Sequence, residues 1–303
     1  MPYAKLEDKV RIYYRFERLE NDDMPVVFVN GSIFNHRQWY HSYLPAFRSF
    51  SKDSHSHLLY DYQGIGKSSP RTKPFNLQDL ADELIGLLDF LGIEKVHLFG
   101  VSKGTLVSQI FTSLYPDRVQ TVGGYGIVNL LAPKDGTVEK IFQDRLRDLL
   151  TLEDILDKRI DRSNFRRVVR ILYTPAIFQK TYHQLNFRQK IMNWLLEGRA
   201  YRLLEGTPLE TLELLLRYWA GDVLSEVDFY TSCLESIEDT PFLLLNGTKD
   251  IVTPPINARD LKTRLERVEL IEYEGFEHIS PNINKGQGRT VMAEYAGFLS
   301  QYV

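Results

Sequence analysis

The chain has 303 residues, of which 43% are hydrophobic and 25% are charged, and its formal net charge is −3. A chain of this length and composition can bury a large core, and its nearly balanced charge excludes the strong positive field on which nucleic-acid binding relies. The single cysteine, Cys233, excludes an intrachain disulfide.

The first 127 residues alternate between predicted strands and predicted helices. Leucines at helical spacing run from Leu77 to Leu91 and stop at Gly92, a residue suited to a helix C-terminus. Such alternation predicts an α/β fold with a mostly parallel, doubly wound sheet covered by helices on both faces. The predicted strands of this part occupy residues 10–16, 25–29, 58–60, 96–99 and 119–125.

The pattern changes between residues 129 and 227. Strand-like runs disappear, and leucines such as Leu209 and Leu212 recur at helical spacing. We therefore expect an inserted helical cap, or lid, over residues 129–227. The α/β core would then consist of residues 1–128 and 228–303.

The predicted cap carries a local excess of basic residues. A solvated helix surface is the favoured interpretation of such an excess. The alternative is a landing surface for an acidic acyl carrier protein or its phosphopantetheine arm. The basic residues are Arg159, Arg162, Arg166, Arg167, Arg170, Lys180, Arg188 and Lys190.

Strands and helices alternate again after the predicted cap. Strands are predicted at residues 241–245 and 268–273, with a helix between them and a last helix near the end of the chain. Reactive groups in a parallel sheet gather beyond the carboxyl ends of its strands. Four segments that follow predicted strands should therefore share one rim of the sheet: Asn30-Gly31-Ser32, residues 100–104, Asp250 and His278.

The candidate nucleophile is Ser102, which lies in a Gly-x-Ser-x-Gly pattern over residues 100–104. A strand-like run precedes this pattern, and apolar residues at helical spacing follow it. In such a strand-turn-helix unit, any side chain at the two glycine positions would collide with a neighbouring element. The pattern predicts a serine hydroxyl raised above the sheet. The alternative is an ordinary serine-containing loop.

A serine hydroxyl becomes a nucleophile when a base takes its proton, and histidine has the appropriate pKa for that role. His278 is the one histidine of the chain that follows a late predicted strand in a loop. The histidine in turn needs a buried carboxylate that holds its tautomer, for which Asp250 is the candidate. The order Ser102, Asp250, His278 is that of the α/β-hydrolase version of this arrangement.

The negative charge that develops on an attacked carbonyl oxygen needs preorganised donors. The backbone amides of Ser32 and Lys103 are the predicted oxyanion-hole donors, with Ile33 as the alternative to Ser32. The Lys103 side chain is expected at the surface.

Three segments resemble the α/β-hydrolase superfamily. Residues 59–68 are similar to its Asp-x-Arg-Gly-x-Gly-x-Ser turn, with Gln63 in place of the arginine. Residues 244–255 resemble the acid turn of enol-lactonases and related esterases, and Phe276-Glu277-His278 resembles the histidine loop. The resemblance implies the α/β-hydrolase fold with a helical lid over the active site.

Other segments are similar to the hydroxyacyl-carrier-protein transacylases and the related synthases of hydroxyalkanoyloxy-alkanoates. They are residues 29–32, residues 233–237 and Asn246-Gly247 followed by Thr253. Those proteins usually carry a tryptophan and two glycines after the nucleophile, whereas this chain has Lys103-Gly104-Thr105.

The sequence as a whole predicts a serine hydrolase that cleaves an ester or thioester of a small molecule through an acyl-enzyme. The alternatives are an acyltransferase fed by a carrier-protein or CoA thioester, and a non-catalytic binding protein of the same fold. No metal, cofactor or nucleic acid is expected. Because no signal-like segment opens the chain and no apolar run is long enough for a membrane span, a cytoplasmic location is expected.

Overall fold

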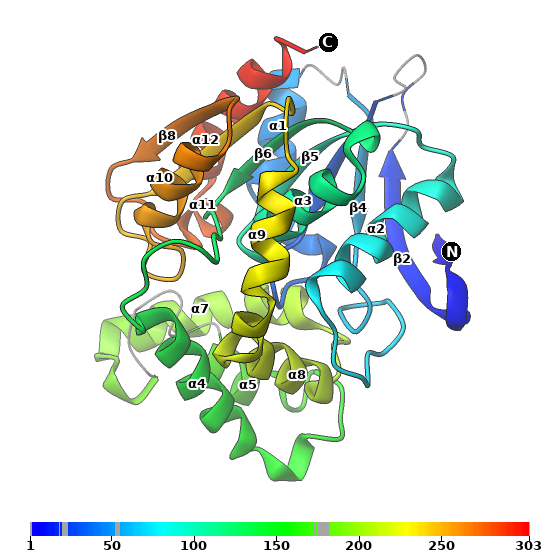
Figure 1. The fold of residues 1–303 in the computed structure, drawn as a ribbon. Helices are drawn as coiled ribbons and strands as arrows, with labels where there is room; N and C mark the ends of the chain where they lie inside the picture. Colours follow the sequence, from blue (N-terminus) through cyan, green and yellow to red (C-terminus); the bar gives the residue numbers. More distant parts are fainter. Residues whose placement is uncertain are drawn as a thin grey trace.

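The computed structural model describes residues 2–17, 19, 24–51, 55–172, 174 and 182–302. Within these ranges, eight strands form one sheet in the order β1-β2-β4-β3-β5-β6-β7-β8 (Figure 1). β2 pairs antiparallel with β1 and β4, and all other pairs are parallel. The strands are β1 (Tyr3–Lys5), β2 (Arg11–Glu17), β3 (Val26–Val29), β4 (His57–Tyr60), β5 (Val96–Val101), β6 (Val119–Tyr125), β7 (Phe242–Gly247) and β8 (Val268–Tyr273).

The buried residues of the strands divide between two apolar clusters, one on each face of the sheet. Val27 and Val29 of β3 belong to the cluster that includes α2 (Leu77–Leu91) and α3 (Lys103–Leu114). Val26 and Phe28 point the other way, into the cluster that includes α1 (Tyr43–Ser51) and α12 (Lys285–Leu299). Successive residues of a strand face opposite sides, and both sides here are apolar. The predicted doubly wound α/β fold is confirmed.

The helix predicted over residues 77–91 forms with the expected ends. Asn76 and Asp79 make a reciprocal capping box at its start, and Gly92 adopts a left-handed conformation (φ 64°) at its end. The remaining elements of the two layers are α9 (Val227–Glu235), α10 (Pro255–Arg264), α11 (Ser280–Ile283) and the short 3-10 turns η1 (Glu7–Lys9), η2 (His36–Trp39) and η3 (Pro116–Arg118).

Residues 129–227, called the helical segment below, separate β6 from β7. Its described part contains no strand beyond the isolated bridge between Arg159 and Pro208. Figure 1 shows its helices together, below the sheet, with α9 leading back to the core. The elements of this segment are α4 (Thr137–Leu150), η4 (Glu153–Ile155), α5 (Phe165–Leu172), η5 (Tyr182–Gln184), α7 (Phe187–Leu204), α8 (Leu209–Ala220) and η6 (Asp222–Glu226).

Apolar faces of α4 and α8 hold the helical segment together. Phe142 and Leu149 of α4 are buried with Leu212 and Trp219 of α8, and the rings of Phe142 and Trp219 lie 6.0 Å apart. None of the helices within the described ranges combines the length and the apolar content that crossing a membrane requires.

Candidate active site

Ser102 occupies a sharp turn between β5 and α3. Its backbone lies at φ 54° and ψ −123°, a strained conformation for a residue with a side chain. A Cβ atom at Gly104 would lie 2.0 Å from the Val29 carbonyl oxygen, and one at Gly100 would lie 2.5 Å from the backbone of Gly104. The two glycines are therefore required by the close approach of β3, β5 and α3.

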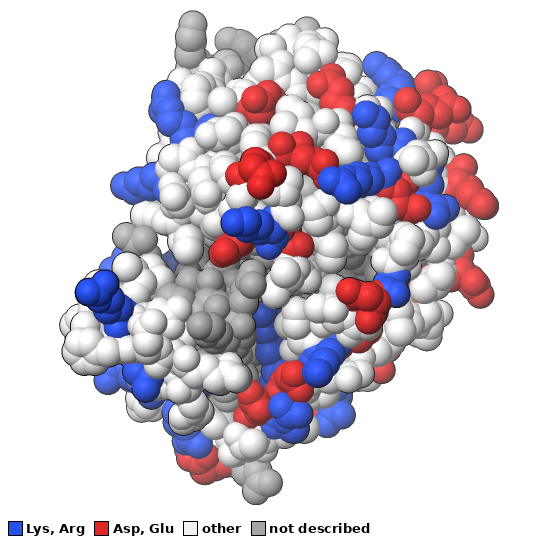
Figure 2. Space-filling model, turned by 90° about the vertical axis from the view of Figure 1, so that its left-hand side faces the viewer, with Lys and Arg blue, Asp and Glu red and all other residues white. Residues whose placement is uncertain are grey.

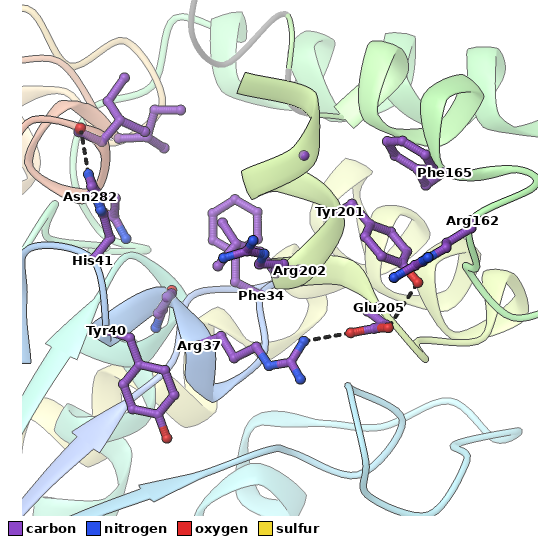
Figure 3. Close-up of a pocket in the computed structure, with 15 residues that line it drawn as sticks. Phe34, Arg37, Tyr40, His41, Arg162, Phe165, Tyr201, Arg202, Glu205 and Asn282 are labelled. Atoms are coloured by element: carbon purple, nitrogen blue, oxygen red, sulfur yellow. Dashed lines mark hydrogen bonds and ion pairs between the residues drawn. The ribbon is translucent and has the colours of Figure 1, made fainter. Parts of the chain in front are cut away.

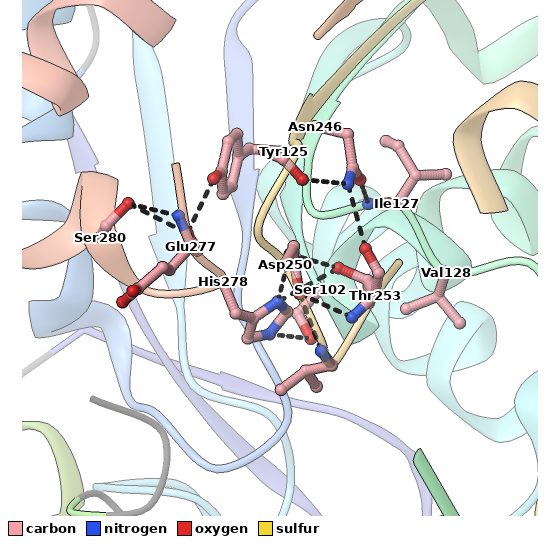
Figure 4. A network of polar contacts seen from close by, with 12 residues as sticks. Ser102, Tyr125, Ile127, Val128, Asn246, Asp250, Thr253, Glu277, His278 and Ser280 are labelled. Carbon is pink, nitrogen blue, oxygen red and sulfur yellow. Dashed lines mark hydrogen bonds and ion pairs between the residues drawn. The ribbon is translucent and has the colours of Figure 1, made fainter. Parts of the chain in front are cut away.

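Ser102, His278 and Asp250 form one chain of hydrogen bonds at the rim of the sheet (Figure 4). Ser102 Oγ lies 3.0 Å from His278 Nε2, and His278 Nδ1 lies 2.8 Å from Asp250 Oδ2. The three side chains come from the loops that follow β5, β7 and β8. The structure thus brings the three predicted residues together across 176 positions of sequence.

Asp250 is held by three donors besides His278. Its Oδ1 accepts hydrogen bonds from the amides of Val252 (2.9 Å) and Thr253 (2.7 Å), and its Oδ2 accepts one from Thr253 Oγ1 (2.7 Å). Thr253 Oγ1 also lies 3.1 Å from His278 Nδ1. The carboxylate is 2% exposed, so these bonds determine which oxygen faces the histidine. Sequence reasoning assigned Thr253 no such part.

Two further residues connect the loops that carry these groups. Asn246, fully buried at the end of β7, accepts the Ile127 amide at 2.9 Å and donates to the Thr253 carbonyl at 3.0 Å. Tyr125 donates its hydroxyl to the Glu277 carbonyl at 2.8 Å. Burial, and then the charge of Asp250, raise the pKa of Tyr125, which keeps it a neutral donor.

The loop after β3 passes beside Ser102. A Cβ at Gly31 would lie 4.0 Å from Ser102 Cβ, and the Gly31 amide donates to Gln38 Oε1 at 3.4 Å. Asn30 stabilises this loop because its Oδ1 accepts bonds from Trp39 Nε1 (2.6 Å) and from Gln38. Ser32, the predicted oxyanion-hole residue, follows in this loop.

Lys103, the second predicted oxyanion-hole residue, is the first residue of α3, and it lines one cavity with Ser32 and Ser102. The prediction that its side chain lies at the surface is wrong. Lys103 is 1% exposed, and its Nζ lies 3.4 Å from the centre of the Tyr62 ring. The loop after β4 covers this side chain. Burial, with a smaller contribution from Arg71, holds the pKa of Lys103 well below its usual value.

Two cavities meet at Ser102. The larger one, about 320 Å³, has mostly apolar walls from the helical segment and from the loops of the core. The smaller one, about 60 Å³, is lined by His278, Ile33 and Arg145 of α4. The residues that line both cavities are Ser32, Ser102, Phe142 and Val252.

A third cavity, about 860 Å³, adjoins the smaller one (Figure 3). The two share Phe34, Gln38, Ile279 and Asn282 as lining residues.

Comparisons with known proteins identify the family of this chain. The model of the alpha/beta hydrolase fold family matches residues 24–281. Rhodomycin D methylesterase DnrP of Streptomyces peucetius is 22% identical over 277 residues, which cover 86% of each chain.

Solved structures show the same fold. The alpha/beta hydrolase MGS-M2 from a Medee basin deep-sea metagenome library superposes with a TM-score of 0.71 at 21% identity, over 96% of this chain and 95% of that one. The enol-lactonase from Burkholderia xenovorans LB400 superposes with a TM-score of 0.68 at 18% identity, over 99% and 100%. The resemblance drawn from the sequence motifs is confirmed: this chain is an enzyme that belongs to the alpha/beta hydrolase fold family.

Proposed function

We propose that this protein is a serine hydrolase that cleaves an ester or thioester through an acyl-enzyme on Ser102. The observation that carries the proposal is the unbroken chain of hydrogen bonds from Ser102 Oγ through His278 to Asp250, at 3.0 and 2.8 Å. Nucleophile, base and orienting carboxylate are the three groups that acyl transfer to a serine requires.

In the first half of the proposed reaction, His278 Nε2 takes the Ser102 proton while Oγ attacks the substrate's carbonyl carbon. The backbone amides of Ser32 and Lys103 donate to the resulting oxyanion. The tetrahedral intermediate collapses to the acyl-enzyme, and His278 gives its proton to the departing alcohol or thiol. Asp250 stabilises the imidazolium throughout.

In the second half, water replaces the departed group. His278 removes a proton from the water as its oxygen attacks the acyl carbon. The second tetrahedral intermediate releases the acid, and the proton returns to Ser102 Oγ.

We also propose that the helical segment acts as a cap over this site. Phe142 and Trp219 of this segment line the larger cavity beside Ser102. Apolar walls around a reacting ester exclude bulk water and strengthen the electrostatic interactions at the oxyanion. The core of the protein would supply the reactive groups, and the cap would supply the walls.

Acyl transfer from a carrier protein receives less support than hydrolysis. Arg166 and Arg170 both pair with Glu197, and Arg167 pairs with Asp154 at 2.7 Å. These three arginines share two carboxylates of the same segment, which leaves less positive charge for an acidic partner. Lys180 lies outside the described residues. The methylesterase relative also supports cleavage of an ester.

The test is a panel of p-nitrophenyl esters and acyl thioesters of increasing chain length, assayed with the wild type and Ser102→Ala. We expect kcat of the variant to fall by roughly 10⁴-fold or more, with an unchanged melting temperature. A fluorescent organophosphonate should label the wild type at Ser102, as located by peptide mass spectrometry.

Undiminished hydrolysis by Ser102→Ala, or no labelling at Ser102, would contradict the proposal and favour a binding protein. Time courses with and without a thiol or alcohol acceptor separate hydrolysis from transfer. Hydrolysis predicts that free acid is released at the same rate in both.

A further inference from the structure

Arg145 of α4 is a buried cation that has no counter-ion among the described residues. It is 9% exposed, and its guanidinium lies over the Phe142 ring, whose centre is 5.5 Å from Cζ. Its Nε is buried and makes no hydrogen bond, and within the described ranges no carboxylate pairs with it. Burial alone lowers its pKa to about 10, so the guanidinium remains charged at neutral pH.

Two other arginines, one buried in the core and one partly exposed in the helical segment, have carboxylate partners. Arg71, 8% exposed in the core, pairs with Glu83. Arg170 in the helical segment pairs with the buried Glu197 at 3.2 Å. A buried charge is costly unless it is paired and hydrogen-bonded. The exception, Arg145, is the one of the three that lines a cavity with Ser102 and His278.

The buried side-chain atoms that lack a hydrogen-bond partner around the two cavities at Ser102 are all nitrogen donors. Besides Arg145 Nε, they are Asn282 Nδ2 in the smaller cavity and Trp219 Nε1 in the larger one. In the described part of these walls, every buried side-chain atom without a hydrogen-bond partner is thus a donor. A ligand that binds beside these donors is therefore better matched to the site when it carries acceptor oxygens.

The adjoining third cavity is also positively charged. Arg37, Arg162 and Arg202 line it, and its one described acidic side chain, Glu205, pairs with Arg37 at 2.5 Å (Figure 3). Figure 2 shows Lys and Arg side chains, with Asp and Glu side chains among them, on the lower part of one face, which the helical segment forms. Positive charge along an approach to a site raises the local concentration of anions.

We propose that the substrate carries a carboxylate and that the Arg145 guanidinium binds it in the smaller cavity while Ser102 attacks the ester carbonyl. A guanidinium matches a carboxylate in planar geometry and charge. This inference rests on the function proposed above and adds the chemical class of its substrate: monoesters or monothioesters of dicarboxylic acids.

The volume of the smaller cavity limits the length of the acid. About 60 Å³ holds roughly four to six water-sized groups. A carboxylate and one to three methylenes fill that space, which corresponds to malonate, succinate or glutarate. The charged side chains of the larger cavity are two lysines and two acids, and most of its other walls are apolar. We therefore assign the uncharged leaving group to the larger cavity.

The test compares two substrates that differ in charge and hardly in shape: methyl hydrogen glutarate and methyl glutaramate, in which an amide replaces the carboxylate. The measured quantity is the ratio of their kcat/KM values from methanol release. Glutarate and glutaramide are compared as competitive inhibitors of p-nitrophenyl acetate hydrolysis. We expect the wild type to prefer the acid over the amide by roughly 10- to 100-fold in both measurements.

The variants are Arg145→Met, Arg145→Lys and, as a matched control, Arg147→Met. Arg147 lies on the same helix, its side chain is 71% exposed, and it pairs with Asp144 at the surface. We expect the acid-to-amide ratio to fall to about one in Arg145→Met, to recover in part in Arg145→Lys, and to keep its wild-type value in Arg147→Met. Melting curves establish that each variant is folded.

A wild-type ratio near one would overturn the inference, as would an undiminished ratio in Arg145→Met. An equal loss in Arg147→Met would overturn it too, because it would assign the preference to general surface charge. If p-nitrophenyl acetate is hydrolysed at Ser102 without an acid preference, the inference fails and the proposed function stands. If no ester is hydrolysed and no probe labels Ser102, both fail.

Discussion

Around Ser102, the α/β core holds the buried carboxylate of Asp250 with several hydrogen bonds, whereas the helical segment places two buried donors beside the site without partners among the described residues. On the core side, Asp250 accepts four hydrogen bonds, including the one from His278. On the other side, Arg145 and Trp219 have buried nitrogens with no acceptor among the described residues. We infer from this difference that the core positions the reacting groups and that the helical segment supplies donors to a bound ligand.

Arg71 and Arg145 differ in the same way: the first has a carboxylate partner and the second has none among the described residues. Both are at least nine-tenths buried, at 8% and 9% exposure. Arg71 belongs to the core and is neutralised by Glu83, while Arg145 belongs to the helical segment and lies over a phenyl ring. Buried charge serves stability in the first case and, as we propose, recognition in the second. Four substitutions test this division, from the largest expected effect to the smallest.

Asp250→Asn should cause the largest loss on the core side. An amide at this position favours the wrong histidine tautomer and cannot stabilise the imidazolium, so we expect kcat to fall by roughly 10⁴-fold. The measurement is kcat for p-nitrophenyl acetate, with a melting curve as the folding check. Asp228→Asn, a change at an exposed position of α9, is the control and should retain wild-type activity. A loss under tenfold in Asp250→Asn would remove Asp250 from the proposed triad.

Arg71→Met should cause the largest loss of stability. It leaves the carboxylate of Glu83 buried and unpaired, so we expect the free energy of unfolding in urea to fall by about 3–5 kcal/mol. The double variant Arg71→Met with Glu83→Leu should recover most of that loss, since it removes both charges. If the single and double variants are equally unstable, packing accounts for the loss and not the unpaired charge.

Thr253→Val removes the hydroxyl that Asp250 Oδ2 accepts and keeps the shape of the side chain. A hydrogen bond to a charged group contributes about 1.5–3 kcal/mol, so kcat should fall by roughly 10- to 100-fold with little change in KM. Thr253→Ser, which keeps the hydroxyl, should restore most of the activity. Equal losses in the valine and serine variants would show that Thr253 acts through packing and does not position Asp250.

Arg145→Met should have the smallest effect and the opposite sign. Removal of a buried, unpaired charge from the ligand-free protein should raise the free energy of unfolding by about 1–2 kcal/mol. Arg147→Met on the same helix should stay within about 0.5 kcal/mol of the wild type. A destabilised Arg145→Met protein would mean that this guanidinium supports the fold, and the contrast with Arg71 would disappear.

The features that sequence reasoning predicted correctly are those that neighbouring residues encode. The alternation of strands and helices, the helix that ends at Gly92 and the Gly-x-Ser-x-Gly turn are local patterns. His278 and Asp250 became candidates because each follows a strand in a parallel sheet, and such strands end at one rim. Knowledge of the sheet topology therefore allowed residues far apart in the chain to be assigned to one site.

The features that were missed depend on contacts between distant segments. The direction of the Lys103 side chain is determined by the loop after β4, which places Tyr62 against it. Arg145 and Arg147 are two residues apart on one helix, yet one is buried beside the active site and the other is exposed. Helical spacing from Phe142 and Leu149 places Arg145 on the buried face of α4. The sequence analysis did not use this signal, and the lack of a carboxylate partner depends on how α4 meets α8 and the core.

Helix α3 lies directly against β3 at Gly104, where an added methyl group would meet the Val29 carbonyl at 2.0 Å. This contact connects the two backbones that carry the proposed oxyanion donors. The strand leads into the loop that carries Ser32, and the helix begins at Lys103, so the two proposed oxyanion donors extend from backbones that lie against each other. This main-chain contact defines the spacing of the donors, and substitutions at positions other than Gly104 leave it in place. Changes of specificity can therefore accumulate in the surrounding walls while the spacing of the donors is preserved.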